Sequence, residues 1–230
     1  MTAQSQNKDN HRRTQTERSE AMRQRLINAT VTCLANEGYA GTTVSKIISQ
    51  ADVSRGAPMH HFPTKASLLE ATAEFLIRWM NRHLARATRG VVDSENRAAD
   101  MITASWRELH DGPESLALME LMLASRRDED LARVMRTLWD AGRQALDMAS
   151  KHYFEPDFNG IKPTQLFVLT HWLMRGMALE RHLMNDAPVA DHFIELWGQV
   201  MSQHLQAKPN VSTPPPRPAF WNRSLATKTD

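Results

Sequence analysis

The chain has 230 residues, of which 41% are hydrophobic and 23% are charged, so it is long enough to bury one large core or two small ones. Only 9 Gly and 2 Tyr, set against 13 Met and 6 Trp, favour helices over a β-sandwich. No apolar run approaches the ~18 residues of a membrane-spanning helix. The single cysteine, Cys33, excludes a disulfide framework within the chain. We therefore expect a cytoplasmic, mostly helical protein with no membrane partner.

The small net charge of +2 conceals an uneven distribution along the chain. The first 65 residues carry nine Lys and Arg against five Asp and Glu, and the tail from Ala207 carries four basic residues and one acid. The middle of the chain, residues 66–206, is left with a net charge of −5. A basic end joined to an acidic body is typical of a polyanion-binding domain on a separate body, although solvated charge clusters give the same pattern.

The first predicted helix runs from Arg18 to Gly38. Residues 1–15 are polar and aperiodic, and we expect them to form a disordered arm. From Arg18 onwards, apolar residues recur at helical spacing, and Cys33 lies on the apolar side as a small buried hydrophobe. Gly38 is the residue best suited to the left-handed conformation that ends many helices.

Two short helices and a tight turn follow. Thr42 and Thr43 provide an N-cap for a helix over residues 44–51. Asp52 tolerates turn and left-handed conformations, so we expect the chain to turn there. Ser54 then caps a second short helix, which runs from Arg55 to about residue 61.

The rest of the chain is predicted to be helical up to its tail. Thr64 caps a long helix from Lys65 to about Arg86, and turn residues separate further helices over 94–110, 113–125, 128–153, 163–185 and 188–206. From Lys208, a run of prolines predicts an extended, unpacked tail. We expect a disordered arm (1–15), a three-helix domain (16–65), a larger helical domain (66–206) and a disordered Pro-rich tail (207–230).

The segment from residue 42 to residue 61 carries the functional signal. Two short helices joined by a tight turn and preceded by a longer helix match a helix-turn-helix. In this motif the first helix braces across the DNA backbone, and the second presents its N-terminal side chains to the major groove. Gly56 and Ala57 are small enough for a close approach to DNA, and Arg55 and His60 provide hydrogen-bond donors.

Three stretches of sequence make a family resemblance specific: 38-GYAGTTVSKI-47, 51-ADVSRGA-57 and 60-HHFPTKASLL-69. Over residues 18–72 the chain resembles the TetR family of bacterial repressors. The resemblance implies an all-α homodimer, in which each subunit has a three-helix DNA-binding domain and a larger helical domain for the effector and the dimer interface. It also implies binding to a palindromic operator in double-stranded DNA, controlled by a small-molecule effector.

The resemblance assigns DNA contacts residue by residue. The candidate DNA-binding residues are Thr42, Thr43, Ser45, Lys46, Ser54, Arg55, Gly56, Ala57, Met59, His60, His61 and Lys65. Two positions depart from the family pattern: Asp52 stands where a turn glycine is usual, and Pro58-Met59 stands where Leu-Tyr is usual. The usual tyrosine contact is therefore absent, and the base preference is not readable from the sequence.

The larger domain has more Trp and Met than a small helical core needs, which favours an adaptable apolar pocket. The candidate effector-pocket residues are Trp79, Met101, Trp106, Met122, Trp139, His171, Trp172 and Arg175. Because a buried charge is costly unless paired, we expect Arg175 to form an ion pair with an acid such as Glu120 or Glu180. The alternative is that Arg175 and His171 anchor an anionic effector.

The last two predicted helices carry excess apolar surface and are predicted to form a four-helix dimer interface. Its candidate residues are Leu173, Met177, Phe193, Trp197, Val200 and Met201, with Gly176 allowing close helix approach. No metal-ligand, nucleophile or phosphate-loop pattern occurs, so we expect no metal, no cofactor and no enzymatic activity. Two alternatives stay open: an activator or architectural DNA-binding protein without an effector, and a helical protein-interaction module.

Overall fold

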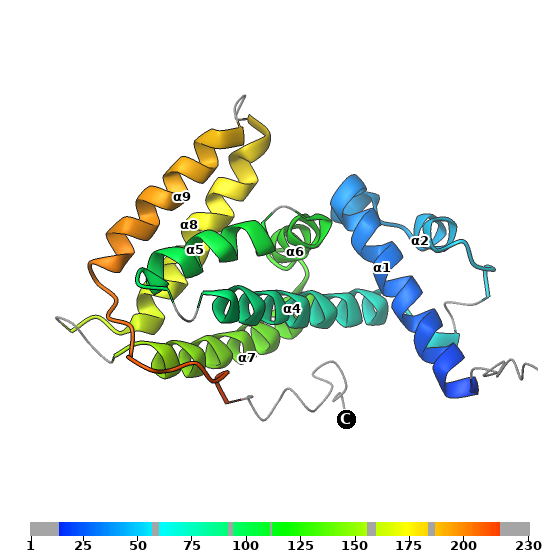
Figure 1. Cartoon of the computed structure of the whole chain (residues 1–230). Helices are drawn as coiled ribbons and strands as arrows, with labels where there is room; N and C mark the ends of the chain where they lie inside the picture. The colour runs from blue at the N-terminus through cyan, green and yellow to red at the C-terminus, as the bar shows by residue number, and fades with distance from the viewer. Residues whose placement is uncertain are drawn as a thin grey trace, which may run out of the picture.

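A computed structural model describes residues 14–56, 60–91, 94–110, 112–155, 160–183 and 187–216. Within these ranges the chain is all-α (Figure 1), and the only β contact is an isolated bridge between Phe154 and Ala207. The helices are α1 (Gln15–Gly41), α2 (Val44–Ala51), α4 (Lys65–Gly90), α5 (Arg97–Leu109), α6 (Pro113–Ala124), α7 (Glu129–Tyr153), α8 (Pro163–Glu180) and α9 (Ala187–Ser202), with a 3₁₀ turn (Arg181–Leu183) after α8. The all-helical fold class is confirmed.

The N-terminal unit packs α1, α2 and the start of α4 around a small core. Leu26 from α1, Ile47 from α2 and Leu68 from α4 are almost fully buried there, together with Phe62. α1 begins at Gln15, slightly before the predicted start, because Thr14 and Glu17 form a reciprocal capping box.

The end of α1 contains the predicted glycine break. Gly38 has φ +69°, a backbone conformation that other residues rarely adopt, and the helical dihedrals are interrupted there before one more turn to Gly41. The break turns the chain towards α2, whose N-cap is Thr43, as expected.

The long helix α4 joins the N-terminal unit to the body of the molecule. Thr64 caps it as predicted, and it continues to Gly90, one turn past the predicted end. Leu68 lies in the core of the N-terminal unit, whereas Leu69, Ala73 and Leu76 lie in a second core shared with α6 and α7. α4 runs beside α7 through the middle of the molecule (Figure 1), so a shift of α4 would move both parts.

The helical body ends in α8 and α9, which lie at the opposite end of the molecule from α1 and α2 (Figure 1). The largest core cluster of the body contains Trp106, Tyr153, Phe154, Met174 and Ile194, each almost completely buried. No helix within the described ranges is sufficiently long and apolar to cross a membrane.

Several boundaries differ from the predicted ones. α5 begins at Arg97 rather than residue 94, because the hydroxyl of Ser94 bonds to the Asp100 carboxylate and to the backbone N–H of Asn96 before the helix starts. α8 ends at Glu180 and gives way to the 3₁₀ turn. α9 ends at Ser202 rather than residue 206.

The beginning of the C-terminal tail is packed, contrary to the expectation of an unpacked segment from Lys208. The backbone N–H of Lys208 bonds to the Tyr153 carbonyl at 2.9 Å, and Arg97 donates to the Lys208 carbonyl at 3.2 Å. Val211 also packs against the core of the body. Composition missed this docking because the contacts join residues more than 50 positions apart. The tail beyond residue 216, and the arm up to residue 13, lie outside the described residues.

Candidate functional site

The exposed face of α2 begins at a well-formed N-cap. The Thr43 hydroxyl accepts a bond of 3.3 Å from the backbone N–H of Lys46, and Thr43, Ser45 and Lys46 are all exposed. Ile47 is fully buried and fixes the orientation of the helix. Lys46 also pairs with Glu37 at 2.5 Å. Three of the predicted DNA-binding residues thus lie together at the N-terminal end of α2.

Thr42, a further predicted contact, has a structural position instead of an exposed one. Its side chain is fully buried, and its hydroxyl donates a bond of 2.7 Å to the Gly38 carbonyl. This bond holds the chain reversal between α1 and α2.

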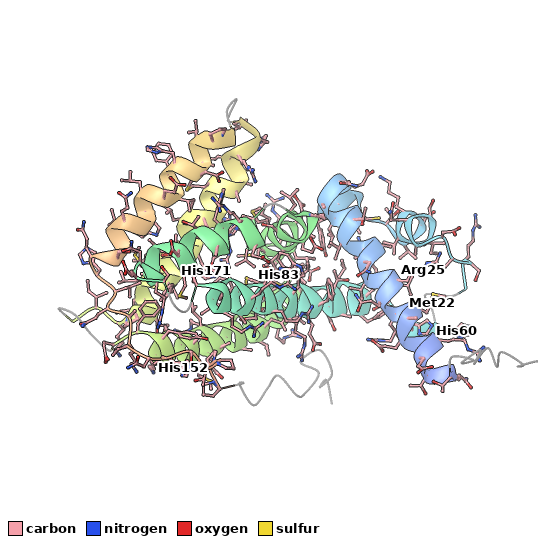
Figure 2. The ribbon with its side chains drawn as sticks, in the orientation of Figure 1. Met22, Arg25, His60, His83, His152 and His171 are labelled. Atoms are coloured by element: carbon pink, nitrogen blue, oxygen red, sulfur yellow. The ribbon has the colours of Figure 1, made fainter. Side chains whose placement is uncertain are left out.

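The turn after α2 is left-handed at Asp52, with φ 50° and ψ 57°. The expected turn at this position is therefore confirmed, and aspartate adopts there the conformation for which glycine is usual. Arg25 of α1 donates to the Asp52 carbonyl at 2.9 Å, and this bond ties the turn to the first helix. Figure 2 shows Arg25 on α1, on the side that carries α2.

The residues after the turn form the most exposed part of the N-terminal unit. Ser54, Arg55 and Gly56 are exposed, and a Cβ added at Gly56 would meet no atom within 4 Å. His60 is exposed and His61 is half-buried. The predicted contacts Ala57 and Met59 lie outside the described residues.

These residues share a concave surface with the start of α1. Ser54, Gly56, His60 and His61 line it together with residues of α1 that include Arg18 and Met22. Arg23 donates to the His61 carbonyl at 3.2 Å and lies over the Phe62 ring at 4.5 Å. These two contacts anchor the chain after the motif to α1.

Lys65, the last predicted DNA contact, lies at the start of α4. Its ammonium is 5.1 Å from the centroid of the Tyr39 ring, in a cation–π contact. Lys65 therefore faces the junction between the N-terminal unit and the body.

Tyr39 joins several helices at that junction. Its backbone N–H donates a bond of 2.9 Å to Glu120 of α6, and its hydroxyl donates a bond of 2.9 Å to Asp128, the N-cap of α7. Burial and the Asp128 carboxylate raise the pKa of Tyr39 to about 12, so the hydroxyl stays a donor. Sequence reasoning missed this junction, since its partners lie 81 and 89 residues away and no local pattern connects them.

The body contains two neighbouring cavities. The first lies between α4, α7 and α8, and the second lies between α4, α5, α7 and α8; Leu84, Leu146 and His171 line both. The space available to the centres of water-sized molecules is about 40 Å³ in the first and about 30 Å³ in the second. Each holds only a few waters as it stands, so a larger ligand requires side chains to move.

Four predicted pocket residues line the first cavity: Trp139, His171, Trp172 and Arg175. Met101 lines the second cavity. The remaining three, Trp79, Trp106 and Met122, line neither of these cavities. Sequence reasoning missed Arg143, which also lines the first.

Trp79, Trp106 and Met122 pack elsewhere in the structure. Trp106 is 1% exposed and donates to Asp191 at 3.0 Å. The rings of Trp79 and His83 contact each other in a tilted arrangement, with their centroids 4.6 Å apart. Met122 packs against the core shared by α4, α6 and α7.

Arg175 does not form the ion pair that we expect from the cost of burying its charge. Within the described residues no carboxylate pairs with it, and its guanidinium lies 4.6 Å from the centroid of the Trp139 ring. Glu120, one expected partner, accepts the Tyr39 N–H instead. Desolvation lowers the pKa of Arg175 to about 10.

Two histidines lie near this arginine. His171 forms a bond of 2.8 Å between Nδ1 and the Phe167 carbonyl, and neither ring nitrogen of buried His110 has a partner in the described part of the chain. Desolvation, with a smaller contribution from the charge of Arg175, lowers the pKa of His110 to about 3 and that of His171 to about 4. Both imidazoles are therefore neutral at pH 7.

The predicted dimer residues divide between surface and core. Leu173, Phe193 and Val200 are exposed, Met177 and Trp197 are partly buried, and Met201 is 1% exposed inside its own subunit. Trp197 donates to Thr170 at 3.0 Å, and this bond ties α9 to α8. The buried Met201 has almost no surface to offer a second copy.

The described part of the N-terminal unit provides α1, α2 and the Asp52 turn of a helix-turn-helix, whereas residues 57–59 of the predicted second helix lie outside the described ranges. Comparisons with known proteins add to this description. Residues 26–72 match the family model described as bacterial regulatory proteins, tetR family. Over 128 residues the chain is 34% identical to the HTH-type transcriptional regulator CymR of Pseudomonas putida, an alignment that covers 55% of this chain and 63% of CymR. The chain thus spans somewhat less than two thirds of this relative's length.

Solved structures resemble the chain over most of its length. A transcriptional regulator from Rhodococcus sp. Rha1 matches with a TM-score of 0.62 and 19% identity, covering 81% of this chain and 99% of that one. A transcriptional regulator from Saccharomonospora viridis in complex with choline matches with a TM-score of 0.60 and 15% identity, covering 83% and 99%. Together, the match of residues 26–72, the curated relatives and these structures support a TetR-family transcriptional regulator.

Proposed function

We propose that the chain is a homodimeric, ligand-responsive repressor that binds a palindromic operator in double-stranded DNA. The observation that carries this proposal is the exposed surface formed by the N-terminal end of α2 and the residues after the Asp52 turn, within the segment that matches the family model. A regulator of this kind binds chromosomal DNA, so its place of action is the cytoplasm. The curated relatives named as transcriptional regulators support this function over an enzymatic one.

In this proposal α2 braces the DNA backbone and the following segment enters the major groove. Thr43 and Lys46 contact phosphates, and Arg55 reads a base edge. Gly56, with open space around its Cβ position, allows the backbone to approach the DNA closely. His60 and His61 contact the flanking phosphates from the concave surface beside α1.

An exposed apolar stripe supports dimer formation. Leu169, Leu173 and Leu179 are 39–52% exposed on α8, and Phe193 and Val200 are 49% and 38% exposed on α9. An apolar stripe across two neighbouring helices indicates a contact with another helical pair. A second copy of α8 and α9 related by twofold symmetry completes a four-helix interface. A twofold dimer in turn places one DNA-binding unit at each half of a palindrome.

The effector part of the proposal rests on the cavities and on α4. A ligand between α4, α7 and α8 contacts the helix that begins at the DNA-binding unit. A ligand weakens DNA binding if it favours a form of the dimer in which the two DNA-binding units have the wrong spacing. DNA then weakens ligand binding by the same factor. The choline complex of a structural neighbour supports small-molecule binding in this fold.

The test is selection of binding sites from a pool of random duplexes with the purified full chain. We expect an enriched palindrome with half-sites about one helical turn apart. Affinity for the enriched duplex should fall linearly with the logarithm of the salt concentration. An enriched site without symmetry contradicts the dimer, and the absence of any salt-dependent binding leaves the protein-interaction module as the better description.

A further inference from the structure

Among the described residues, the charged side chains that line the two central cavities are Arg143 and Arg175, both in the first cavity, and no aspartate or glutamate lines either one. His171, a neutral imidazole, lines both. The other residues around the first cavity are apolar or aromatic except Asn81. A cavity with this lining attracts a negative charge and disfavours a cation such as a quaternary amine.

Arg175 is the strongest anion-binding group in this set. It has no ion pair within the described residues, and the flat face of Trp139 covers one side of its guanidinium at 4.6 Å. This contact with the ring face does not use the N–H groups of the guanidinium. A planar guanidinium held in this way matches a carboxylate, which accepts two parallel N–H bonds from it.

Within the described residues, the neighbouring histidines have no negative partner either. The Nδ1 of His171 bonds to the Phe167 carbonyl and therefore carries a proton, which leaves Nε2 available to a ligand. His110, close to both His171 and Arg175, has no partner for either ring nitrogen within the described ranges. The lowered pKa values of Arg175, His171 and His110 agree with a desolvated site in which the described residues provide no counter-charge.

The remaining walls favour an apolar ligand body. Trp139, Leu138 and Val168 line the first cavity, and Met101, Phe167 and Met174 line the second. Leu84 and Leu146, which line both cavities, lie between them, and flexible side chains of this kind can move to join two small spaces into one. A strongly hydrated inorganic anion would lose its hydration shell in such a site without filling it.

We propose that the effector is an amphipathic carboxylate, with its carboxylate on Arg175 and its apolar body extending from Trp139 past Leu84 and Leu146 into the second cavity. The regulatory role of this ligand rests on the proposed function, whereas the binding site is argued from the contacts around Arg175 alone. The expected ligand class is an apolar acid, and cationic amines and inorganic anions are excluded.

The experiment measures binding of matched probes to the full chain by tryptophan fluorescence and thermal shift. The acids are 4-phenylbutyrate and octanoate, and each is compared with its primary amide and with an amine of equal length. We expect at least one acid to bind about tenfold or more tightly than its amide, as a charge-assisted pair implies. The amines are expected not to bind.

Three variants assign the effect to the arginine. Arg175→Met keeps the length and apolar stem of the side chain, so it should leave the amide affinity unchanged and abolish the preference for the acid. Arg175→Lys should keep part of that preference, because lysine retains the charge without the planar fork. Arg82→Met, on the exposed face of α4 and outside both cavity linings, is the matched control and should behave like the wild type.

Four outcomes overturn the site: no acid binds, an amine binds as tightly as the acid, the amide binds as tightly as the acid, or Arg175→Met retains the acid preference. Circular dichroism identifies a variant that fails to fold. If Arg175→Met does not fold, the preference of Arg175→Lys for the acid over its amide is used instead. Operator binding is measured separately. If no acid binds but the operator is bound, the proposed ligand class is wrong and the proposed DNA-binding function is retained. If an acid binds through Arg175 but no duplex is bound, the ligand site is retained and the DNA-binding function is wrong.

Discussion

The backbone N–H of Tyr39 lies 2.9 Å from Oε2 of Glu120, across 81 positions of sequence. Tyr39 follows the break at Gly38 and belongs to the N-terminal unit, whereas Glu120 belongs to α6 of the body. The Tyr39 hydroxyl also reaches Asp128, which caps α7, and its ring lies beneath Lys65 at the start of α4. Since α4 and α7 both line the first cavity, this residue connects the cavity helices to the DNA-binding unit.

Removing the Tyr39 hydroxyl tests this connection. Tyr39→Phe loses the bond to Asp128 and should lower the free energy of unfolding by about 1 kcal/mol. Tyr153→Phe is the matched control, because the buried Tyr153 hydroxyl has no partner among the described residues and its removal should cost nothing. Urea denaturation measures both variants. Equal destabilisation by the two substitutions contradicts a specific role for the Tyr39 bond.

The same variant tests the coupling between ligand and DNA. If Tyr39 transmits the movement of α4 and α7, Tyr39→Phe should bind the effector as the wild type does and show a smaller change in operator affinity when the ligand is added. Fluorescence anisotropy with a labelled duplex provides the affinities. An unchanged coupling factor would show that the bond between the Tyr39 hydroxyl and Asp128 does not transmit the signal.

Acid should destabilise the protein through its buried histidines. The pKa of His110 falls from 6.5 to about 3 on folding, so between these values the unfolded chain binds more protons than the folded one. Stability is therefore complete above about pH 6.5 and is lost as the pH falls, by about 1 kcal/mol per pH unit for each such histidine. His171 acts in the same direction, with a pKa of about 4.

His110→Phe isolates this effect, since phenylalanine preserves a flat ring beside Trp106 and removes the titrating group. Chemical denaturation at pH 7 and pH 5 should give a smaller loss of stability for the variant than for the wild type. A pH dependence identical in both proteins would mean that His110 is charged or exposed in the folded state.

Dimer formation is tested by placing a charge on the apolar stripe. Leu173→Glu or Phe193→Glu should convert a dimer into a monomer in sedimentation experiments, because an unpaired carboxylate would be buried in the interface. Leu116→Glu is the matched control, as Leu116 is 47% exposed on α6 and away from α8 and α9. If the stripe variants remain dimeric, or if the wild type is a folded monomer at micromolar concentration, the interface is elsewhere or absent.

Features set by neighbouring residues could be predicted from the sequence. The caps at Thr43 and Thr64, the break at Gly38 and the left-handed turn at Asp52 all depend on local backbone chemistry. Long-range contacts could not be predicted in this way. Tyr39 and Glu120 meet only after the helices have packed, and periodicity shows that Trp106 is apolar without showing which neighbour covers it. The ion pair expected for Arg175 is absent from the described part of the chain, because general charge rules do not locate an acid in three dimensions.

Substitution of a residue that contacts a base and substitution of one that contacts a phosphate should affect DNA binding in different ways. Arg55→Ala should lower affinity by about 1–3 kcal/mol and relax the preference at one position of each half-site, if Arg55 reads a base edge. Lys46→Ala should weaken binding to all duplexes alike and reduce the salt slope by about one. Arg82→Ala, an exposed arginine of the body, should change neither. Sequence selection repeated with each variant distinguishes the two roles, and an Arg55→Ala profile that equals the wild type removes this residue from base recognition.

The proposed function depends on specific binding of duplex DNA by the segment from α2 to His61. The most direct measurement is the affinity of the full chain for its selected duplex and for a scrambled duplex of equal length, at one fixed salt concentration. We expect the selected duplex to bind about 1,000-fold or more tightly, which is the lower range for specific regulators. We also expect Arg55→Ala to reduce this ratio. Equal affinity for the two duplexes, or a ratio that is unchanged in the variant, would contradict the proposed function.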